Sequence, residues 1–393
     1  MCAVAVTGMG IVSSLGKNLF ENYQSLNTGK TGISTPEILQ TNYKDLPVGE
    51  IKINNTRLSN DLGLNPGHSY TRAALLGCMA VRELLHNSGL SEFDPGTGFI
   101  SGTTVGGMDM TESFFDQFSE NSENLRYIQA QHPGFTTEKI AAYFGLNAMV
   151  TTISTACSSS ANAIMLGARL IESGRLKRVI VGGTDCLTRF TLNGFNSLKI
   201  LSGETCKPFD ENRNGLNLGE AAAYLLLEAD EMKGNRPAIA RISGYGNAND
   251  AFHQTASSQN GEGAYLAMKK AIEKAGVDPV NINYINAHGT GTGNNDLSES
   301  VAIKRVFGDH IPEFSSTKAL TGHTLGAAGA VEAVISIMAI QNQEVFPNLN
   351  FSQPIRDTGL MPETKLHSKQ LNYVLSNSFG FGGNCTSLIF RNE

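Results

Sequence analysis

One succession of elements occurs twice in this chain of 393 residues, and it constrains the fold more than any other feature. The first copy predicts a strand, a polar loop, a helix rich in small residues and two further strands, in residues 150–153, 154–160, 161–172, 178–182 and 222–227. The second copy predicts the same succession in residues 314–316, 317–323, 325–340, 373–376 and 386–390. Strands that alternate with helices favour mostly parallel sheets covered by helices. We therefore expect an α/β fold made of two duplicated halves, residues 1–230 and 231–393.

The two small-residue helices, 161–172 and 325–340, are expected to pack closely against each other in the middle of the molecule. Sheets and helices on either side would then give an α-β-α-β-α arrangement. Nearer the start of the chain, residues 4–7 predict a short strand that ends in a turn at Gly8-Met9-Gly10. Apolar residues at helical spacing predict a helix over 73–86.

The charge balance argues against a nucleic-acid partner. Lys and Arg number 30 and Asp and Glu number 36, which gives a net charge of −6. A nucleic-acid binder usually carries a basic excess. Hydrophobic residues make up 40% and charged residues 17%, so the chain can bury a large core and disorder is excluded for most of it.

The cysteines and the apolar segments predict a soluble, cytoplasmic protein. The six cysteines contain no CxxC pair, which indicates neither a disulfide framework nor a zinc site (Cys2, Cys78, Cys157, Cys186, Cys206 and Cys385). The first six residues lack the basic and apolar regions of a signal peptide. The apolar stretch 326–340 contains Glu332 and is shorter than the roughly 20 residues that span a bilayer. No membrane partner is expected.

Cys157 is the strongest candidate for a catalytic residue. It lies between a predicted strand and a predicted helix, so the unpaired N–H groups at the start of that helix point at its sulfur. This position is expected to lower the pKa of the thiol and to favour the nucleophilic thiolate. A packing role is the alternative, because cysteine is often buried. For the other five cysteines we keep the packing interpretation.

Two histidines are also candidates, each beside a glycine-rich segment. His288 lies in the segment 286–293, which directly follows the apolar strand 282–285, at the end of a strand where open α/β sheets place ligand groups. His323 lies at the start of the second small-residue helix, where the dipole disfavours the imidazolium ion. A neutral ring there can donate a hydrogen bond to a developing oxyanion. A structural role in the core or at a helix cap remains open for both histidines.

Other groups are expected to support these side chains. Lys318 and Glu332 flank His323 in the sequence and are expected to form an ion pair. The glycine-rich turn 378–384 exposes backbone N–H groups that can serve as oxyanion donors, although an ordinary hairpin turn is an alternative. No metal site or cofactor is expected, because His288 and His323 have no third ligand in register.

These segments closely resemble the β-ketoacyl-[acyl-carrier-protein] synthases, the decarboxylating condensing enzymes of fatty-acid and polyketide synthesis. The matching stretches occur in the family's order and are specific as a set: VAVTGMGIVSSLG at 4–16, TACSSSA at 155–161, KPFDENRNGLNLGE at 207–220, NAHGTGTGNND at 286–296, SSTKALTGHTLGAAGAVEA at 315–333 and NSFGFGG at 377–383. The resemblance implies a thiolase-like five-layered α-β-α-β-α fold and a dimer. It also implies that acyl- and malonyl-loaded acyl carrier protein are the partners.

The resemblance assigns a role to each catalytic residue. Cys157 would take the acyl group from a carrier-protein thioester, and its own N–H would form the oxyanion hole with that of Phe381. His288 and His323 would bind the carbonyl of the malonyl thioester and stabilise the enolate left when CO₂ departs. Attack of that carbanion on the acyl-Cys157 thioester would give a 3-oxoacyl product.

The resemblance also implies supporting residues. Lys318 and Glu332 match the family's ion pair beside His323, and Asp296 and Glu299 match acidic residues behind the catalytic groups. The segment 102–107 is similar to one that helps line the acyl tunnel.

The chain departs from the family pattern at several positions outside the Cys-His-His set. Asn214 replaces an Asp, Asn384-Cys385 replaces a Thr-Asn or His-Asn pair, and the loop 201–208 is several residues shorter than usual. The basic cluster that often precedes the early helix is largely missing, with only His68 and Arg72 in its place.

Three classes of function follow. The first is an elongating condensing enzyme of fatty-acid biosynthesis that works as a homodimer. The second is a specialised polyketide or polyene ketosynthase, or the chain-length-setting partner of a heterodimer. Such partners typically lose the cysteine, whereas Cys157 is kept. A coenzyme A-dependent condensing enzyme or a Cys-His hydrolase is disfavoured, because neither would use both histidines.

Overall fold

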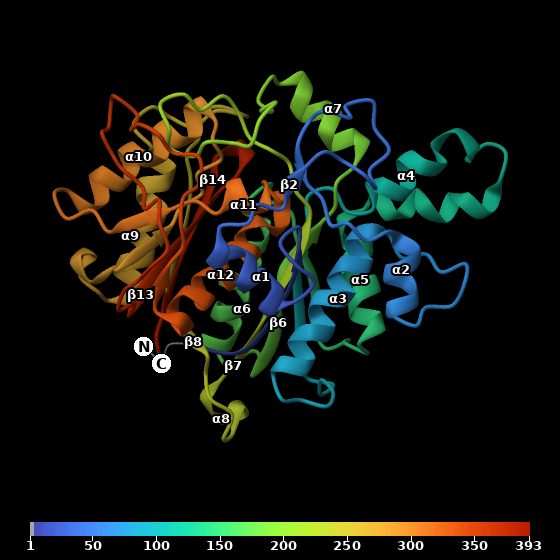
Figure 1. The fold of residues 1–393 in the computed structure, drawn as a ribbon. Helices are drawn as coiled ribbons and strands as arrows, with labels where there is room; N and C mark the ends of the chain where they lie inside the picture. Colours follow the sequence, from blue (N-terminus) through green and yellow to red (C-terminus); the bar gives the residue numbers. More distant parts are fainter. Residues whose placement is uncertain (1–3) are drawn as a thin grey trace.

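The structure, a computed structural model, describes residues 4–393 (Figure 1). Its strands are β1 Val4–Ser13, β2 Ile33–Ser34, β3 Val48–Gly49, β4 Gly98–Gly102, β5 Val150–Ile153, β6 Arg178–Asp185, β7 Ala221–Glu228, β8 Ala240–Asn249, β9 Tyr284–Asn286, β10 Glu313–Ser315, β11 Glu344–Val345, β12 His367–Ser368, β13 Tyr373–Phe379 and β14 Asn384–Arg391. Its helices are α1 Leu19–Thr28, α2 Asn55–Asp61, α3 Arg72–Asn87, α4 Met108–Phe114, α5 Pro133–Tyr143, α6 Ser159–Glu172, α7 Arg189–Ser197, α8 Asp230–Lys233, α9 Glu262–Ala275, α10 Gly293–Phe307, α11 Lys318–Thr321 and α12 Ala328–Asn342. Cys2 and the first three of the six N-terminal residues that lack signal-peptide features lie outside the described residues.

The main sheet repeats one strand order. Its first five strands along the sheet are β10-β9-β13-β14-β8, and the remaining five, counted from the other edge, are β5-β4-β6-β7-β1. Numbered by their order along the chain, the strands of each half therefore lie in the order 3-2-4-5-1. The halves meet where β1 pairs with β8, with Val4 opposite Ile242. The expectation of an α/β fold with two duplicated halves is confirmed.

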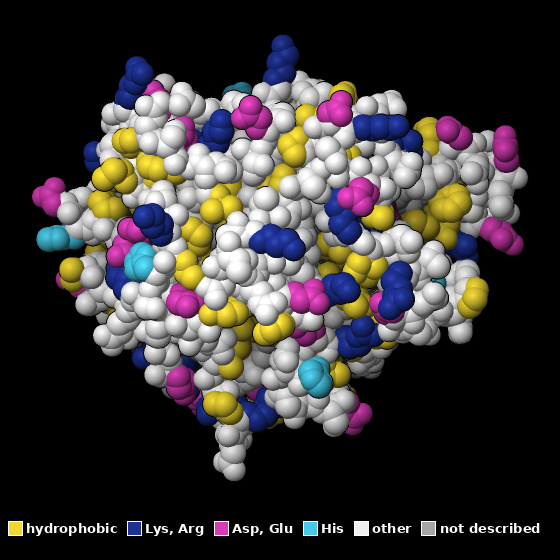
Figure 2. All heavy atoms as spheres, viewed as in Figure 1, with side chains coloured by type: hydrophobic (Ala, Val, Ile, Leu, Met, Phe, Trp, Pro, Cys, Tyr) yellow, Lys and Arg dark blue, Asp and Glu magenta, His cyan; other side chains and the backbone are white. Residues whose placement is uncertain are grey.

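The elements stack in the five layers that the sequence indicated. In Figure 1, α9 and α10 cover the outer side of the β8, β13 and β14 sheet, and α3 and α5 cover the outer side of the other half. Helices α6 and α12 contact each other between the two halves of the sheet. On the face drawn in Figure 2, basic and acidic side chains are interspersed.

The sheet is mixed, so the expectation of mostly parallel pairing is wrong. Within the described residues, β4 is parallel to β5 and β6, and β9 is parallel to β10 and β13. The other pairings of the main sheet are antiparallel. Parallel neighbours need a crossover connection that returns the chain to the edge where the first strand began. The connections from β6 to β7 and from β13 to β14 do not do this, so β7 runs antiparallel to β6 and β14 runs antiparallel to β13.

The first strand is longer than its sequence indicated. The segment Gly8-Met9-Gly10 continues β1 after a register shift between Val6 and Gly8, and it is not a turn. A Cβ atom at Gly10 would lie 2.1 Å from the carbonyl oxygen of Ala80 in α3. Glycine is required here because a helix packs against the strand backbone.

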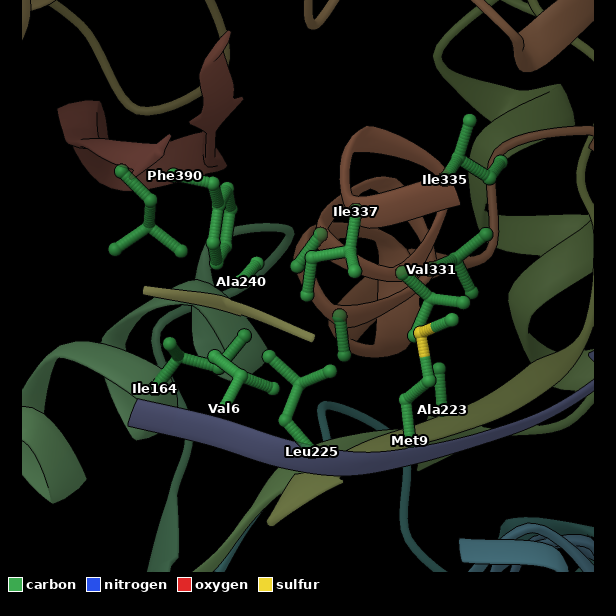
Figure 3. Close-up of a cluster of buried hydrophobic side chains, with 14 of the residues drawn as sticks. Val6, Met9, Ile164, Ala223, Leu225, Ala240, Val331, Ile335, Ile337 and Phe390 are labelled. Atoms are coloured by element: carbon green, nitrogen blue, oxygen red, sulfur yellow. The ribbon is translucent and has the colours of Figure 1, made fainter. Parts of the chain in front are cut away.

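The largest hydrophobic cluster fills the space between the two halves of the sheet (Figure 3). Its side chains come from β1, β7, β8, β14, α6 and α12, among them Val6, Met9, Ile164, Ala223, Leu225, Ala240, Val331, Ile335, Ile337 and Phe390. In the described part of the chain, one helical stretch, Leu325–Asn342, is long and apolar enough to cross a membrane, but 89% of it is buried inside the protein. The core helix of a soluble protein has the same properties.

The contact between α6 and α12 is tight enough to test. A Cβ atom at Gly329 would lie 2.7 Å from the Ala161 Cβ atom and 2.8 Å from the Ala161 nitrogen. We expect Gly329→Val to lower the free energy of unfolding by about 1–3 kcal/mol, because it overpacks this contact. Urea denaturation measures the change. The control is Gly194→Ala on α7, where a Cβ meets nothing within 4 Å. Equal loss in both variants would contradict the prediction.

Candidate active site

Cys157 lies in the short turn that joins β5 to α6. The preceding residue, Ala156, has a φ of +52°, a left-handed conformation that bends the chain sharply before the helix. The Ser159 hydroxyl holds this turn by accepting the N–H of Thr155 at 2.9 Å. Cys157 is 6% exposed, and it lines a cavity.

His323 lies next to this sulfur. It follows α11 and Gly322, whose φ is +73°, and its Nε2 lies 3.0 Å from the Cys157 Sγ. The His323 N–H donates to the Asn217 carbonyl at 2.7 Å, and its carbonyl accepts the Gly219 N–H at 2.9 Å. These bonds fix the backbone, while the Nδ1 atom of the ring has no hydrogen-bond partner among the described residues.

His288 follows β9 and lies beside His323. The two ring centroids are 5.4 Å apart and the rings are nearly perpendicular, at 86°. The Lys318 Nζ atom donates to the His288 carbonyl at 2.6 Å and lies 3.3 Å from the His288 Nδ1. An ammonium group can only donate. The Nδ1 atom is therefore an acceptor, and the proton of a neutral His288 ring is on Nε2.

The expected ion pair between Lys318 and Glu332 is present and fully buried. The order of residues in the sequence predicted that this ion pair lies beside His323. In the structure, the histidine that Lys318 contacts by hydrogen bonds is His288. Glu332 lies on α12, and its other oxygen accepts the Ser378 hydroxyl at 3.3 Å. The ion pair therefore joins α11, α12 and the loop after β9.

Two further carboxylates hold the loop that carries His288. Glu299 accepts the N–H groups of His288 and Gly289 at 2.9 and 2.8 Å. Asp296 accepts the N–H of Phe209 at 2.8 Å and that of Gly291 at 3.1 Å. Both carboxylates are buried and belong to α10. They accept hydrogen bonds from backbone N–H groups, so they support the loop that carries His288.

Phe381 lies in the glycine-rich turn between β13 and β14. Its backbone N–H is hydrogen-bonded to the Cys157 sulfur, and its ring stacks on Phe195 with centroids 5.8 Å apart. The turn is anchored by Asn384, whose Oδ1 accepts from the Ser158 hydroxyl and the Asn162 amide, both at 2.8 Å. The sequence pointed to Asn384 only as a departure from the family, and it did not point to Asn162.

Burial sets the protonation of these groups. It lowers the pKa of His288 and His323 well below 6.5, and the positive charge of Lys318 lowers both further. Both rings are therefore neutral near pH 7. Burial raises the pKa of Cys157 to about 11, although Lys318 and the Phe381 N–H act in the opposite direction. The expectation of a lowered thiol pKa is wrong, because loss of solvation outweighs the effects of Lys318 and the Phe381 N–H.

A cavity reaches the candidate groups. It is lined by Cys157, His288, His323, Phe381 and Cys385, and by the loop residues 250 and 253–257. That loop was missed in the sequence, where its residues form no motif that stands out. Among residues 4–393 no group of three or more His, Cys, Asp or Glu side chains has the arrangement of a metal site.

The sequence matches two family profiles. Residues 1–232 match the β-ketoacyl synthase N-terminal domain, and residues 239–352 match the β-ketoacyl synthase C-terminal domain. The chain belongs to the β-ketoacyl synthase family. It is 31% identical over 408 aligned positions to the 3-oxoacyl-[acyl-carrier-protein] synthase 2 of Staphylococcus aureus strain N315, covering 99% of this chain and 98% of that relative.

Solved β-ketoacyl synthase structures have the same fold. The ishigamide ketosynthase/chain length factor superposes with a TM-score of 0.93 at 28% identity and covers 100% of this chain and 99% of that one. A ketosynthase from Xenorhabdus doucetiae, solved in complex with its chain length factor, gives a TM-score of 0.85 at 31% identity and covers 100% and 98%. The thiolase-like five-layered fold is confirmed.

Arg72 is one of the two residues that stand where the family often has a basic cluster. Its charge is buried and does not lie on the surface. Its guanidinium group is buried against Glu220, with Nη2–Oε1 and Nε–Oε2 distances of 2.6 and 2.8 Å. It also donates to the carbonyls of Ile51 and Ile53. The arginine therefore holds the start of α3 against the β7 segment and is not available for docking a partner.

The Lys318–Glu332 pair generates a stability prediction. Lys318→Met leaves a buried carboxylate without its cation, and we expect the free energy of unfolding to fall by about 3–5 kcal/mol. The double variant Lys318→Met/Glu332→Leu removes both charges and is expected to recover most of that loss. Chemical denaturation of the three proteins measures both effects.

The matched control is the exposed pair of Lys269 and Glu273, whose charged atoms are 3.9 Å apart. Lys269→Met is expected to change the free energy of unfolding by less than about 1 kcal/mol. A double variant less stable than Lys318→Met alone would contradict the assignment.

Proposed function

We propose that this protein is an elongating β-ketoacyl-[acyl-carrier-protein] synthase. It condenses an enzyme-bound acyl group with malonyl-[acyl-carrier-protein] and releases CO₂ and 3-oxoacyl-[acyl-carrier-protein]. The observation that carries the proposal is the 3.0 Å separation of the Cys157 Sγ and the His323 Nε2, with the neutral ring of His288 beside them. The name of the Staphylococcus aureus relative supports the carrier protein as the partner.

The first half-reaction acylates Cys157. Its sulfur attacks the thioester carbonyl of the acyl carrier protein, a new carbon–sulfur bond forms, and the carrier leaves as the thiol with the proton of Cys157. The N–H groups of Cys157 and Phe381 stabilise the oxyanion of the tetrahedral intermediate. The bond from the Phe381 N–H to the sulfur supports this role. A covalent intermediate divides a difficult carbon–carbon bond formation into two steps.

The second half-reaction decarboxylates the malonyl thioester. The Nε2–H groups of His288 and His323 donate to the thioester oxygen, on which negative charge develops as CO₂ departs. Neutral donors suit this task because they stabilise the developing charge without titrating near pH 7. Lys318 supports His288 by donating to its Nδ1, which keeps the ring proton on Nε2. Glu332, Asp296 and Glu299 hold the loops that carry these groups.

Condensation completes the cycle. The enolate carbon attacks the acyl-Cys157 carbonyl, a carbon–carbon bond forms, and the sulfur of Cys157 leaves and takes up one proton. One malonyl thioester, one acyl-enzyme and one proton thus give one 3-oxoacyl thioester, one CO₂ and the free thiol. The reaction requires no metal or organic cofactor.

The two halves divide this chemistry between them. In our proposal residues 1–230 supply the nucleophile, and residues 231–393 supply both histidines. The protein works in the cytoplasm as a homodimer.

A second candidate function is that of a ketosynthase paired with a chain-length-setting subunit. The superposition on the ishigamide ketosynthase/chain length factor, with a TM-score of 0.93, favours it. The polyketide or polyene pathway would then replace fatty-acid synthesis. Copurification with a related second chain would support this alternative, whereas activity of the isolated homodimer would argue against it.

Acylation of Cys157 is the direct test of the proposed nucleophile. We expect intact-mass spectrometry to detect an acyl adduct after exposure to a panel of acyl-carrier-protein thioesters, and Cys157→Ala to give none. The control is Cys78→Ala, which removes a buried thiol of α3 outside the cavity. An adduct on the Cys157→Ala protein would exclude the nucleophile, and the rank of adducts reports the preferred chain length.

The lowered pKa of the two histidines generates a pH prediction. Because the pKa of each buried ring lies below 6.5, both rings stay neutral when the pH falls through the value at which a solvated histidine takes up a proton. We expect the rate of CO₂ release from malonyl-[acyl-carrier-protein] to stay level between about pH 8 and pH 6.5. A loss of rate centred near pH 6.5, with the melting temperature unchanged, would contradict the prediction that both histidines act as neutral donors.

A further inference from the structure

Asp185 is a buried carboxylate at the end of β6 that the proposed reaction leaves without a role. Its side chain has no exposed surface, and it does not line the cavity that reaches Cys157. Its two oxygens accept hydrogen bonds from two segments that are far apart in the sequence. These segments are the loop after β4 and the turn that follows His323.

The loop after β4 surrounds one side of the carboxylate. The Thr103 hydroxyl donates to Oδ1 at 2.5 Å, and the Val105 N–H donates to the same oxygen at 3.2 Å. Thr104 donates its N–H to Oδ2 at 2.9 Å, and its hydroxyl also bonds this oxygen. All of these partners are donors, which is the arrangement that suits an ionised carboxylate.

The turn after His323 approaches the same carboxylate from the other side. The Gly326 N–H donates to the Asp185 Oδ2 at 2.8 Å and lies 3.1 Å from the Thr104 hydroxyl oxygen. A Cβ atom at Gly326 would lie 2.7 Å from that Oδ2. Between this anchor and His323 lies Leu325, which has a φ of +53°.

The backbone conformation explains why an anchor is needed here. A non-glycine residue with positive φ is strained and persists only where its surroundings over-determine it. The backbone of His323 itself is held by two bonds, because its N–H donates to the Asn217 carbonyl and its carbonyl accepts the Gly219 N–H. On its C-terminal side, the bond from Gly326 to Asp185 restrains the strained turn.

We propose that Asp185 is a positioning residue that acts through Gly326 and Leu325 to hold the His323 ring at hydrogen-bond distance from Cys157. The step it affects rests on the proposed function, namely the decarboxylation that His323 assists. Asp185 does not touch the substrate. It sets where the His323 Nε2 atom lies when negative charge develops on the thioester oxygen.

The test is Asp185→Asn, which keeps the shape of the side chain and turns one acceptor into a donor. Both half-reactions are measured: acyl-adduct formation on Cys157 by mass spectrometry, and CO₂ release from malonyl-[acyl-carrier-protein]. We expect CO₂ release to fall about tenfold to a hundredfold, the scale at which misplaced catalytic groups reduce rates. Adduct formation is expected to change by less than about threefold, because it depends on the N–H groups of Cys157 and Phe381.

A matched control separates positioning from general destabilisation. Glu228 is an equally buried carboxylate at the opposite end of the β6–β7 pair, where it accepts from Thr7 and Arg178 at 2.5 and 2.6 Å. Glu228→Gln is expected to lower the melting temperature without changing the ratio of the two half-reaction rates. If the ratio of CO₂ release to adduct formation is the same in the Asp185→Asn and Glu228→Gln proteins, the proposal is overturned.

A second pair of variants keeps the test decisive if Asp185→Asn does not fold. Thr104→Val removes the hydroxyl that bridges Asp185 and Gly326, and Thr104→Ser retains it. We expect Thr104→Val to slow CO₂ release selectively and Thr104→Ser to restore it. Identical rates in these two variants would overturn the proposal. Failure of the wild-type protein to release CO₂ would instead refute the proposed function.

Discussion

The buried ammonium group of Lys318 is the interaction on which the candidate site depends. It binds the carboxylate of Glu332 and the carbonyl of His288, so it joins α11, α12 and the loop after β9. Its charge also lowers the pKa of His288 and His323 and opposes the rise in the pKa of Cys157. One buried cation thus holds the loops together and adds to the burial that keeps both imidazoles neutral, which is the state that suits donors to an oxyanion.

Close helix packing makes that arrangement possible. The helices α6 and α12 meet at Ala161 and Gly329, where no larger side chain fits. Because they meet near their N-terminal ends, the Cys157 turn and the His323 turn lie side by side although they belong to different halves of the chain. The small residues of both helices are therefore required for the site as well as for the core.

Much of the site could be predicted from the sequence because three of the candidates follow a strand. Cys157, His288 and Phe381 come after β5, β9 and β13, and in α/β sheets the carboxyl ends of strands carry the functional loops. Other features depend on neighbours that are distant in the sequence. Arg72 resembles a surface charge until Glu220 is seen to cover it, and the glycines of β1 resemble a turn until α3 is seen to pack on them.

The sequence by itself determined the repeated strand and helix order and the family, and it predicted the nucleophile and the two imidazoles, because these depend on local pattern and residue type. Only the tertiary structure decided which groups meet. Lys318 supports His288, burial raises the pKa of the Cys157 thiol, and Asp185 lies against the turn that follows His323. The physical reason is that desolvation and hydrogen-bond partners are set by atoms far apart along the chain, 30 residues for Lys318 and His288 and 141 for Asp185 and Gly326, and no sequence pattern records the distances between them.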